Sequence, residues 1–136
     1  MKTSLILLII VMTSVINLSA QTKNAKIEVL YFKANLACCK AKSCNALEND
    51  IKTIIVKNYP DSNSVIFKEI KLVDEANKAL IEKYKAESQT VIIIKKKKKK
   101  ETSIDVTDIV KIYIKDQNKE SLEKQLISKI NEPIKK

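Results

Sequence analysis

All three cysteines of this 136-residue chain lie in one short stretch, LACCKAKSCNALE (36–48). Cys38 and Cys39 are adjacent, and Cys44 follows five residues after Cys39. Thiols spaced in this way can exchange disulfides, hold a soft metal ion, or form a structural disulfide that leaves one thiol over. The chemistry of the chain is therefore expected to depend on this segment.

The N-terminal stretch MKTSLILLIIVMTSVINLSA (1–20) has the features of a secretory signal peptide. It starts with a basic residue, Lys2, continues with an aliphatic run, and ends on small residues at Ala20. This pattern predicts export with cleavage near Ala20, which leaves one domain over residues 21–136. The expected location is the periplasm or the exterior, where disulfides can persist.

The composition excludes several kinds of site. The chain has a formal net charge of +10, contains no glycine, histidine or tryptophan, and has lysine as its only basic residue. Without histidine there is no Ser-His-Asp triad, no Cys-His pair and no histidine metal ligand. Without glycine there is no glycine-rich phosphate loop, and without arginine there is no bidentate readout of phosphate or guanine. Nucleic acid is therefore not an expected partner, despite the charge.

Strands and helices are predicted to alternate along the rest of the chain. Runs of β-forming residues predict strands, and apolar residues at helical spacing predict helices. The predicted strands are KIEVLYF (26–32), SVIFKEIKLV (64–73), QTVIII (89–94) and ETSIDV (101–106). The predicted helices run from Cys44 to residue 57, with Ser43 as N-cap, and over 74–84, 107–115 and 119–131.

This order predicts an α/β fold with a four-stranded mixed sheet flanked by helices. Strands 27–32 and 65–70 are expected to be parallel, and 91–94 is expected to be central and antiparallel to 104–106. The cysteine segment joins the first strand to the first helix, which is where α/β sheets gather their sites. Helix N-termini favour thiolates there, and Cys44 begins the apolar stripe of the helix, which predicts a shielded thiol.

The remaining singled-out residues are expected to be structural. The aromatic side chains predicted to lie in the core are Tyr31, Phe32, Phe67, Tyr84 and Tyr113. Glu48 is expected to be a solvated helix residue, and Asp105 and Asp108 are expected to be surface or capping residues. The six lysines at 95–100 are predicted to form a solvated hairpin end, with an anionic lipid surface or an acidic partner as the sharper hypothesis.

Several short stretches, taken in order, resemble a known family. They are VLYF (29–32) with the cysteines starting seven residues past Tyr31, CNALE (44–48), DEANKALIEKY (74–84), QTVIII (89–94) and VTDIV (106–110). From Lys26 to Asn131 the chain is similar to thioredoxin-like proteins. More narrowly, it resembles the nitrophenyl compound nitroreductase subunit ArsF-type family of small exported bacterial proteins. The resemblance implies a thioredoxin-like fold, to which the last helix is an addition.

The family's pattern has two cysteines separated by two residues at the start of the helix. Cys38 falls on the first of them and Cys44 on the second, so this chain carries a three-residue expansion and Cys39 is extra. In thioredoxins the first cysteine is exposed, the second is shielded, and a cis-proline before the third strand lies against them. Gln89 and Thr90 occupy that place here, which predicts that their loop faces the site.

The position of the cysteines in such a fold, at a capped helix start with Lys40 and Lys42 nearby to favour thiolate, predicts thiol-disulfide exchange in the cell envelope. The expected partners are protein thiols or disulfides, and a monomer without cofactor or metal is expected. The more exposed of Cys38 and Cys39 would attack a substrate disulfide, and Cys44 would resolve the mixed intermediate. The residues leave alternatives open. These are a structural disulfide from Cys44 to Cys38 or Cys39, a strained Cys38–Cys39 disulfide, and a non-catalytic module that binds a partner protein or, through the three thiols, a thiophilic ion such as Cu(I) or trivalent arsenic.

Overall fold

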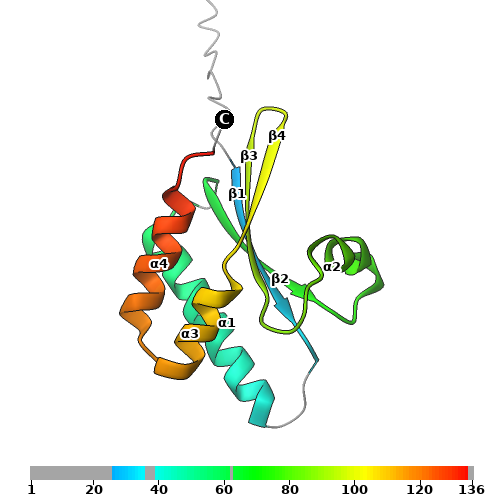
Figure 1. Cartoon of the computed structure of the whole chain (residues 1–136), viewed down its shortest axis with the longest axis vertical. Helices are drawn as coiled ribbons and strands as arrows, with labels where there is room; N and C mark the ends of the chain where they lie inside the picture. The colour runs from blue at the N-terminus through cyan, green and yellow to red at the C-terminus, as the bar shows by residue number, and fades with distance from the viewer. Residues whose placement is uncertain (1–25, 36–38, 62, 135–136) are drawn as a thin grey trace, which may run out of the picture.

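The domain is a four-stranded sheet with helices on both faces, seen in a computed structural model that describes residues 26–35, 39–61 and 63–134 (Figure 1). The predicted signal peptide and Cys38 lie outside these residues. The elements are β1 (Lys26–Lys33), α1 (Cys39–Asn58), β2 (Val65–Lys71), the 3-10 turn η1 (Glu75–Asn77), α2 (Lys78–Tyr84), β3 (Val91–Lys97), β4 (Lys100–Asp105), α3 (Thr107–Asp116) and α4 (Lys119–Asn131).

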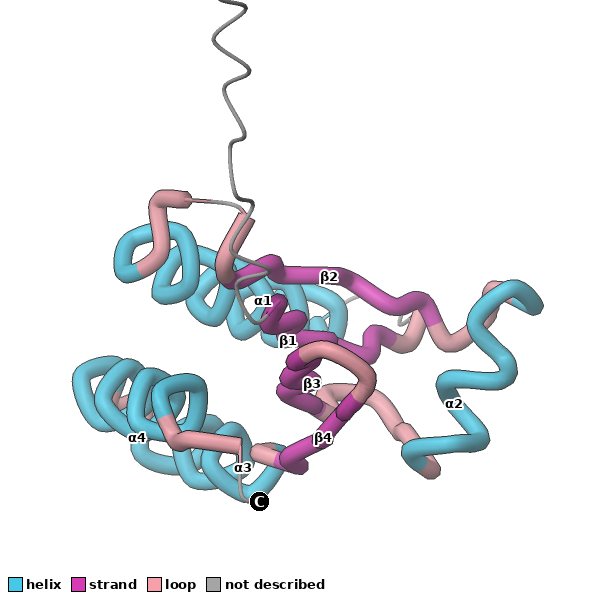
Figure 2. Tube along the Cα trace, turned by 90° about the horizontal axis from the view of Figure 1, so that it is seen from above, coloured by secondary structure: helices cyan, strands magenta, loops and turns pink. Residues whose placement is uncertain are grey.

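The strand order in the sheet is β2-β1-β3-β4. Strand β1 is parallel to β2 and antiparallel to β3, and β3 and β4 form an antiparallel hairpin. Helices α1, α3 and α4 cover one face and the short α2 covers part of the other (Figure 2). This arrangement is the one expected for a thioredoxin-like fold with α4 as an additional helix, so the predicted α/β fold class and strand directions are confirmed.

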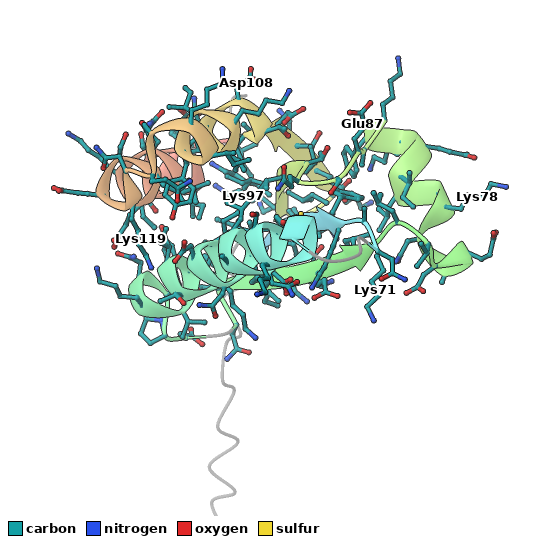
Figure 3. The ribbon with its side chains drawn as sticks, turned by 90° about the horizontal axis from the view of Figure 1, so that it is seen from below. Lys71, Lys78, Glu87, Lys97, Asp108 and Lys119 are labelled. Atoms are coloured by element: carbon teal, nitrogen blue, oxygen red, sulfur yellow. The ribbon has the colours of Figure 1, made fainter. Side chains whose placement is uncertain are left out.

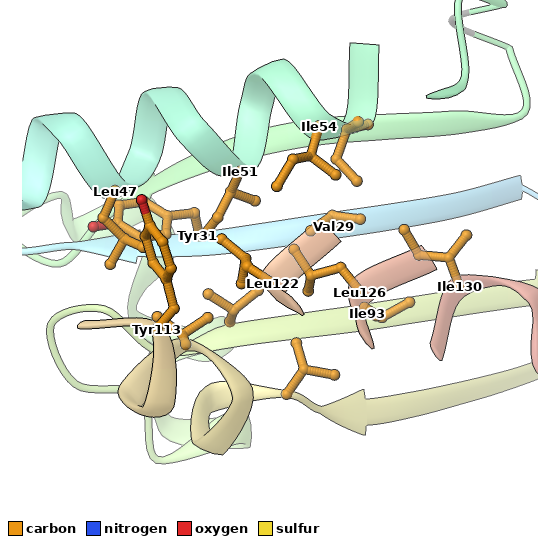
Figure 4. Packing of buried hydrophobic residues seen from close by; sticks show 14 of the residues in the cluster. Val29, Tyr31, Leu47, Ile51, Ile54, Ile93, Tyr113, Leu122, Leu126 and Ile130 are labelled. Atoms are coloured by element: carbon orange, nitrogen blue, oxygen red, sulfur yellow. The ribbon is translucent and has the colours of Figure 1, made fainter. Parts of the chain in front are cut away.

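Strand β1 is buried on both faces because its apolar residues continue without alternation. Val29 and Tyr31 face the larger core, which also holds side chains from α1, β3, α3 and α4 (Figure 4). Leu30 and Phe32 face the smaller core under α2. All four side chains are at most 2% exposed, as is typical of a central strand in a covered sheet.

The aromatic residues predicted to be in the core lie there. Tyr31, Phe32 and Tyr113 are buried, while Phe67 and Tyr84 are partly buried and pack against the two cores. Charged side chains such as Lys78 on α2 and Asp108 on α3 point outward (Figure 3). Within the described ranges, none of the helices combines the length and the apolar character needed to span a bilayer.

The first helix begins five residues earlier than predicted. Helix α1 starts at Cys39, so Ser43 lies inside its first turns and the prediction that Ser43 is the N-cap is wrong. The segment CKAKS contains no glycine or proline, and its lysines and alanine are good helix formers. The apolar stripe begins only at Cys44, which is why apolar periodicity placed the start of the helix there.

The lysine run is divided between structural and exposed positions, so the prediction of six solvated lysines is wrong for Lys95. Strand β3 continues to Lys97 and β4 starts at Lys100, which leaves only two lysines in the turn. Lys95 is 2% exposed, and its ammonium donates to the carbonyl oxygens of Lys129, at 2.7 Å, and Glu132. Strand alternation places it on the face that packs against α4, where it supplies donors to carbonyls that a helix C-terminus leaves unpaired.

Replacing Ile93 with alanine should lower the free energy of unfolding by about 2–5 kcal/mol, because the side chain is fully buried in the central strand β3. Ile112→Ala is the matched control, since Ile112 on α3 is 50% exposed and should change stability by less than about 0.5 kcal/mol. Urea denaturation measures both. A loss below about 1 kcal/mol for Ile93→Ala contradicts the burial of β3.

Replacing Lys95 with alanine should cost about 1–3 kcal/mol, because two carbonyl oxygens at the end of α4 lose their donor. Lys99→Ala, in the exposed turn, removes the same charge and should stay within about 0.5 kcal/mol of wild type. If the two variants are equally stable in urea, Lys95 does not hold α4 to the sheet.

Candidate functional site

Cys44 is a buried thiol on the inner face of α1. It is 4% exposed and free of any disulfide. Leu47 and Ile51, one and two turns further along, lie on the same face and are also buried. The predicted apolar stripe from Cys44 is therefore confirmed, and the helix holds this thiol against the sheet.

The hydroxyl of Tyr31 ties Cys44 to the central strand. It donates to the main-chain carbonyl oxygen of Cys44 at 3.1 Å, and both partners are buried. Burial raises the pKa of Tyr31 well above its ordinary value, and the nearby Cys44, Glu48 and Glu69 side chains raise it further. Tyr31 is thus a neutral hydrogen-bond donor that fixes the start of α1 over β1.

The loop before β3 brings a side-chain amide to the thiol. Gln89 Nε2 lies 3.3 Å from Cys44 Sγ. The main-chain N–H of Gln89 donates to Phe32 O at 2.8 Å, and the N–H of Phe32 donates to Thr90 O at 2.9 Å. These two bonds hold the loop against the end of β1, with Gln89 in the left-handed region at φ 70°.

Of the two residues predicted in the loop that faces the site, Gln89 contacts Cys44 and Thr90 has a structural position. Thr90 is 7% exposed, and its hydroxyl oxygen accepts from the N–H of Glu87 at 3.0 Å. The contact from Gln89 is the one that bears on thiol chemistry, because hydrogen bonds to a developing thiolate stabilise it.

Helix geometry constrains the relation between Cys39 and Cys44. Cys39 is the first residue of α1, and five residues of α-helix rise about 7.5 Å along the axis. That rise alone exceeds the Cα–Cα distance of about 4.4–6.8 Å that disulfides require. A Cys39–Cys44 disulfide is therefore incompatible with this helical first turn. Cys38 lies outside the described residues, so the helical rise does not exclude a Cys38–Cys44 disulfide.

A charged cluster lies at the carboxyl ends of β1 and β2, and Glu48 belongs to it. Lys33 Nζ is 2.6 Å from Glu48 Oε2 and 3.6 Å from Glu69 Oε2. The prediction that Glu48 is solvated is wrong, since its side chain is only 17% exposed. Glu48 lies one helical turn after Cys44, and its side chain reaches Lys33 at the end of β1.

The two carboxyl groups of this cluster titrate in opposite directions. Burial alone raises the pKa of Glu48, but hydrogen bonds with Lys33 and Glu69 outweigh burial, so the net pKa is lowered. Hydrogen bonding with Glu48 raises the pKa of Glu69, and burial raises it further. Glu69 therefore keeps a proton to higher pH than Glu48 does, and Lys33 carries the balancing positive charge.

A cavity of about 390 Å³ opens beside this cluster, at the point where the chain leaves β1 for the cysteine segment. Its walls include Lys33, Asn35 and Glu69. Sequence reasoning missed these residues, although a signal was present. Lys33, Glu69 and Lys71 are charged residues at the carboxyl ends of the first two strands, and such positions meet at one edge of a parallel pair.

Asp105 and Asp108 lie at the surface near the start of α3, as predicted. The alternative in which the three cysteines bind a metal ion stays a prediction. Asp105 accepts from the N–H of Thr107 at 2.8 Å, and Asp108 is exposed at the start of α3. Among the residues that the structure describes, no three acidic, cysteine or histidine side chains gather as metal ligands would. The proposed thiol cluster requires Cys38, which lies outside that set.

Comparisons with known proteins add little to this geometry. No protein family model matches the chain, and no curated protein does. A solved structure described as "Structure of a malarial protein" is 21% identical and covers 68% of this chain and 96% of its own, with a TM-score of 0.39. A likeness at that level carries no argument about function, which must rest on the residues themselves.

The raised pKa of Tyr31 predicts a specific loss of stability at alkaline pH. Tyrosine in an unfolded chain ionises near pH 10, whereas folded Tyr31 keeps its proton to higher pH. The contribution of Tyr31 to the free energy of unfolding is thus fully present below about pH 10 and is lost as the pH rises through the pKa of Tyr31 in the folded protein. Tyr31→Phe should cost about 0.5–1.5 kcal/mol at pH 8, through the lost hydrogen bond to Cys44.

The measurement is urea denaturation of both proteins at pH 8 and at pH 11. The variant should lose less stability than wild type between these values, because the other titrating groups are common to both. Equal losses would show that Tyr31 is not held neutral by the fold.

Proposed function

We propose that this protein is an exported thiol-disulfide exchange protein of the cell envelope. Cys44 is the observation that supports the proposal most strongly. It is a buried thiol with an amide donor at 3.3 Å, placed just after two further thiols at the carboxyl end of the central strand. Export is supported by the signal-peptide pattern of residues 1–20.

The proposed reaction has two exchange steps. A thiolate in the pair Cys38–Cys39 attacks one sulfur of a substrate disulfide, forms a mixed disulfide and expels the first substrate thiolate. Cys44 then attacks the protein sulfur of the mixed disulfide and expels the second substrate thiolate. The substrate gains two electrons, the protein is left with an intrachain disulfide, and an external dithiol must reduce it for another turnover.

The neighbours of Cys44 suit the second step. Gln89 Nε2 donates toward its sulfur, which favours the negative charge that forms when this thiol loses its proton. Tyr31 holds the main chain of Cys44 in place, so the resolving thiol keeps its position while the substrate is bound. Burial of Cys44 keeps it from reacting first with bulky disulfides.

We further propose Cys38 as the attacking thiol. The helical rise between Cys39 and Cys44 is too long for a disulfide, and Cys38 precedes the described start of α1. Cys39 would then be the additional thiol, next to the reacting pair but not required by it.

Single serine variants test these roles with Cys39→Ser as the matched control. In an assay of insulin reduction by dithiothreitol, the Cys38→Ser variant should leave the reaction at its uncatalysed rate. The Cys39→Ser variant should keep most of the wild-type acceleration. Cys44→Ser should accumulate a mixed disulfide with substrate, detected by mass spectrometry, because attack survives and resolution does not.

Three results would contradict this assignment in different ways. Loss of activity in Cys39→Ser but not in Cys38→Ser would mean that the first turn of α1 unwinds during exchange. Absence of exchange in wild type, with Cu(I) or arsenite binding that every single variant abolishes, would favour the non-catalytic metal-binding module. A change in thermal stability alone would make the cysteines a structural element.

A further inference from the structure

The tip of the β3–β4 hairpin carries four consecutive exposed lysines, Lys97 to Lys100. Lys97 and Lys100 are direct cross-strand partners, and Lys98 and Lys99 form the turn between them. Like charges directly opposite each other on two strands are destabilising. No ion pair within the described part of the chain involves Lys97, Lys98 or Lys99. The fold therefore leaves concentrated positive charge at this tip.

Two carboxylates on the strands beside the tip, Glu28 and Glu101, are already engaged. Glu28, which is 6% exposed, lies 2.9 Å from Lys68 Nζ and 3.1 Å from Lys96 Nζ. Glu101 lies 2.8 Å from Lys83 Nζ on α2 and 3.8 Å from Lys96 Nζ. These pairs form a line of alternating charge across the sheet, from Lys68 on β2 to Lys83 on α2.

The tip lies at the opposite end of the domain from the cysteine segment. Strand β1 starts beside the hairpin, where Lys26 pairs with Lys96, and ends at Lys33, just before the cysteines. Its eight residues span roughly 26 Å at ~3.3 Å per residue. Figure 1 shows the β3–β4 turn at one end and the first turn of α1 at the other.

We propose that Lys97–Lys100 dock this protein onto the surface of an anionic lipid membrane and leave the cysteine end facing away from it. The lysine ammonium is a compact point charge that needs no directional partner, so a plane of anionic head groups can meet several of them at once. Each such lysine contributes about five-fold in binding, the factor that corresponds to ~1 kcal/mol near an anionic surface.

Other polyanions fit the tip less well. The stretch from Lys95 to Ser103 contains no apolar or aromatic side chain. Protein interfaces take their affinity from buried aromatic, arginine and aliphatic anchors, and single-stranded nucleic acids stack on aromatic residues. Charge without such anchors is the pattern that lipid head groups match.

The test is sedimentation with vesicles of phosphatidylcholine containing phosphatidylserine, at low salt. The chain that starts at Gln21 is used, because it lacks the apolar N-terminal stretch and retains every strand and helix described; cooperative thermal unfolding checks that it is folded. The tip variant is Lys97→Gln/Lys98→Gln/Lys99→Gln. The control is Lys78→Gln/Lys115→Gln/Lys124→Gln, which removes the same charge from exposed positions on α2, α3 and α4.

We expect the tip variant to bind about 100-fold more weakly than the starting protein, which is five-fold compounded over three lysines. The control should lose no more than a few-fold, and added salt should weaken binding of the starting protein steeply. Equal losses in the two variants would overturn the proposal in favour of non-specific net charge. Capture by soluble polyglutamate with no binding to vesicles would overturn it in favour of an acidic partner.

Discussion

The burial of strand β1 on both faces is the constraint on which the rest of the structure depends. Val29 and Tyr31 on one face, and Leu30 and Phe32 on the other, are almost fully buried, so the middle of β1 must lie between two strands and two layers of helix. The same burial brings the Tyr31 hydroxyl to Cys44 O. Main-chain bonds from Phe32 also hold the Gln89 loop beside the thiol. The geometry around Cys44 is therefore a direct consequence of how β1 is packed.

Much of the fold was predictable because the spacing of apolar residues along the sequence follows which side chains are buried. Residues 29–32 of β1 form an uninterrupted apolar run, and Leu122, Leu126 and Ile130 recur every four residues in α4; all are buried. Periodicity failed where polar residues have structural positions. Lys95 is buried because α4 offers it carbonyl acceptors, and Glu48 is half-buried because Lys33 is its partner. These partners are 34 and 15 residues away in the sequence, so the spacing of neighbouring residues could not indicate them.

The lysines of this chain have two physical roles: some pair with buried acceptors, and others present exposed charge at the hairpin tip. The net charge of the chain does not distinguish the two groups. Some satisfy buried acceptors, as Lys95 does at the end of α4 and Lys96 does at Glu28. The hairpin tip, by contrast, projects exposed ammonium groups at the end of the sheet remote from the thiols. A protein with this division can bind a charged surface with one end while the other remains accessible to substrates. The proposed exchange chemistry and the proposed docking are thus spatially independent.

Native-state alkylation of the reduced protein measures directly whether the fold shields Cys44 and leaves the preceding cysteines reactive. Trypsin separates the two groups, since ANLACCK carries Cys38 and Cys39 and SCNALENDIK carries Cys44. Labelling with iodoacetamide over time is followed on both peptides by mass spectrometry, in buffer and in guanidinium. We expect folding to slow the labelling of Cys44 by at least ~100-fold, because a buried group is exposed only when the structure opens, while ANLACCK reacts at close to its unfolded rate. Equal labelling rates for Cys44 in the folded and unfolded protein would show that the fold does not shield this thiol.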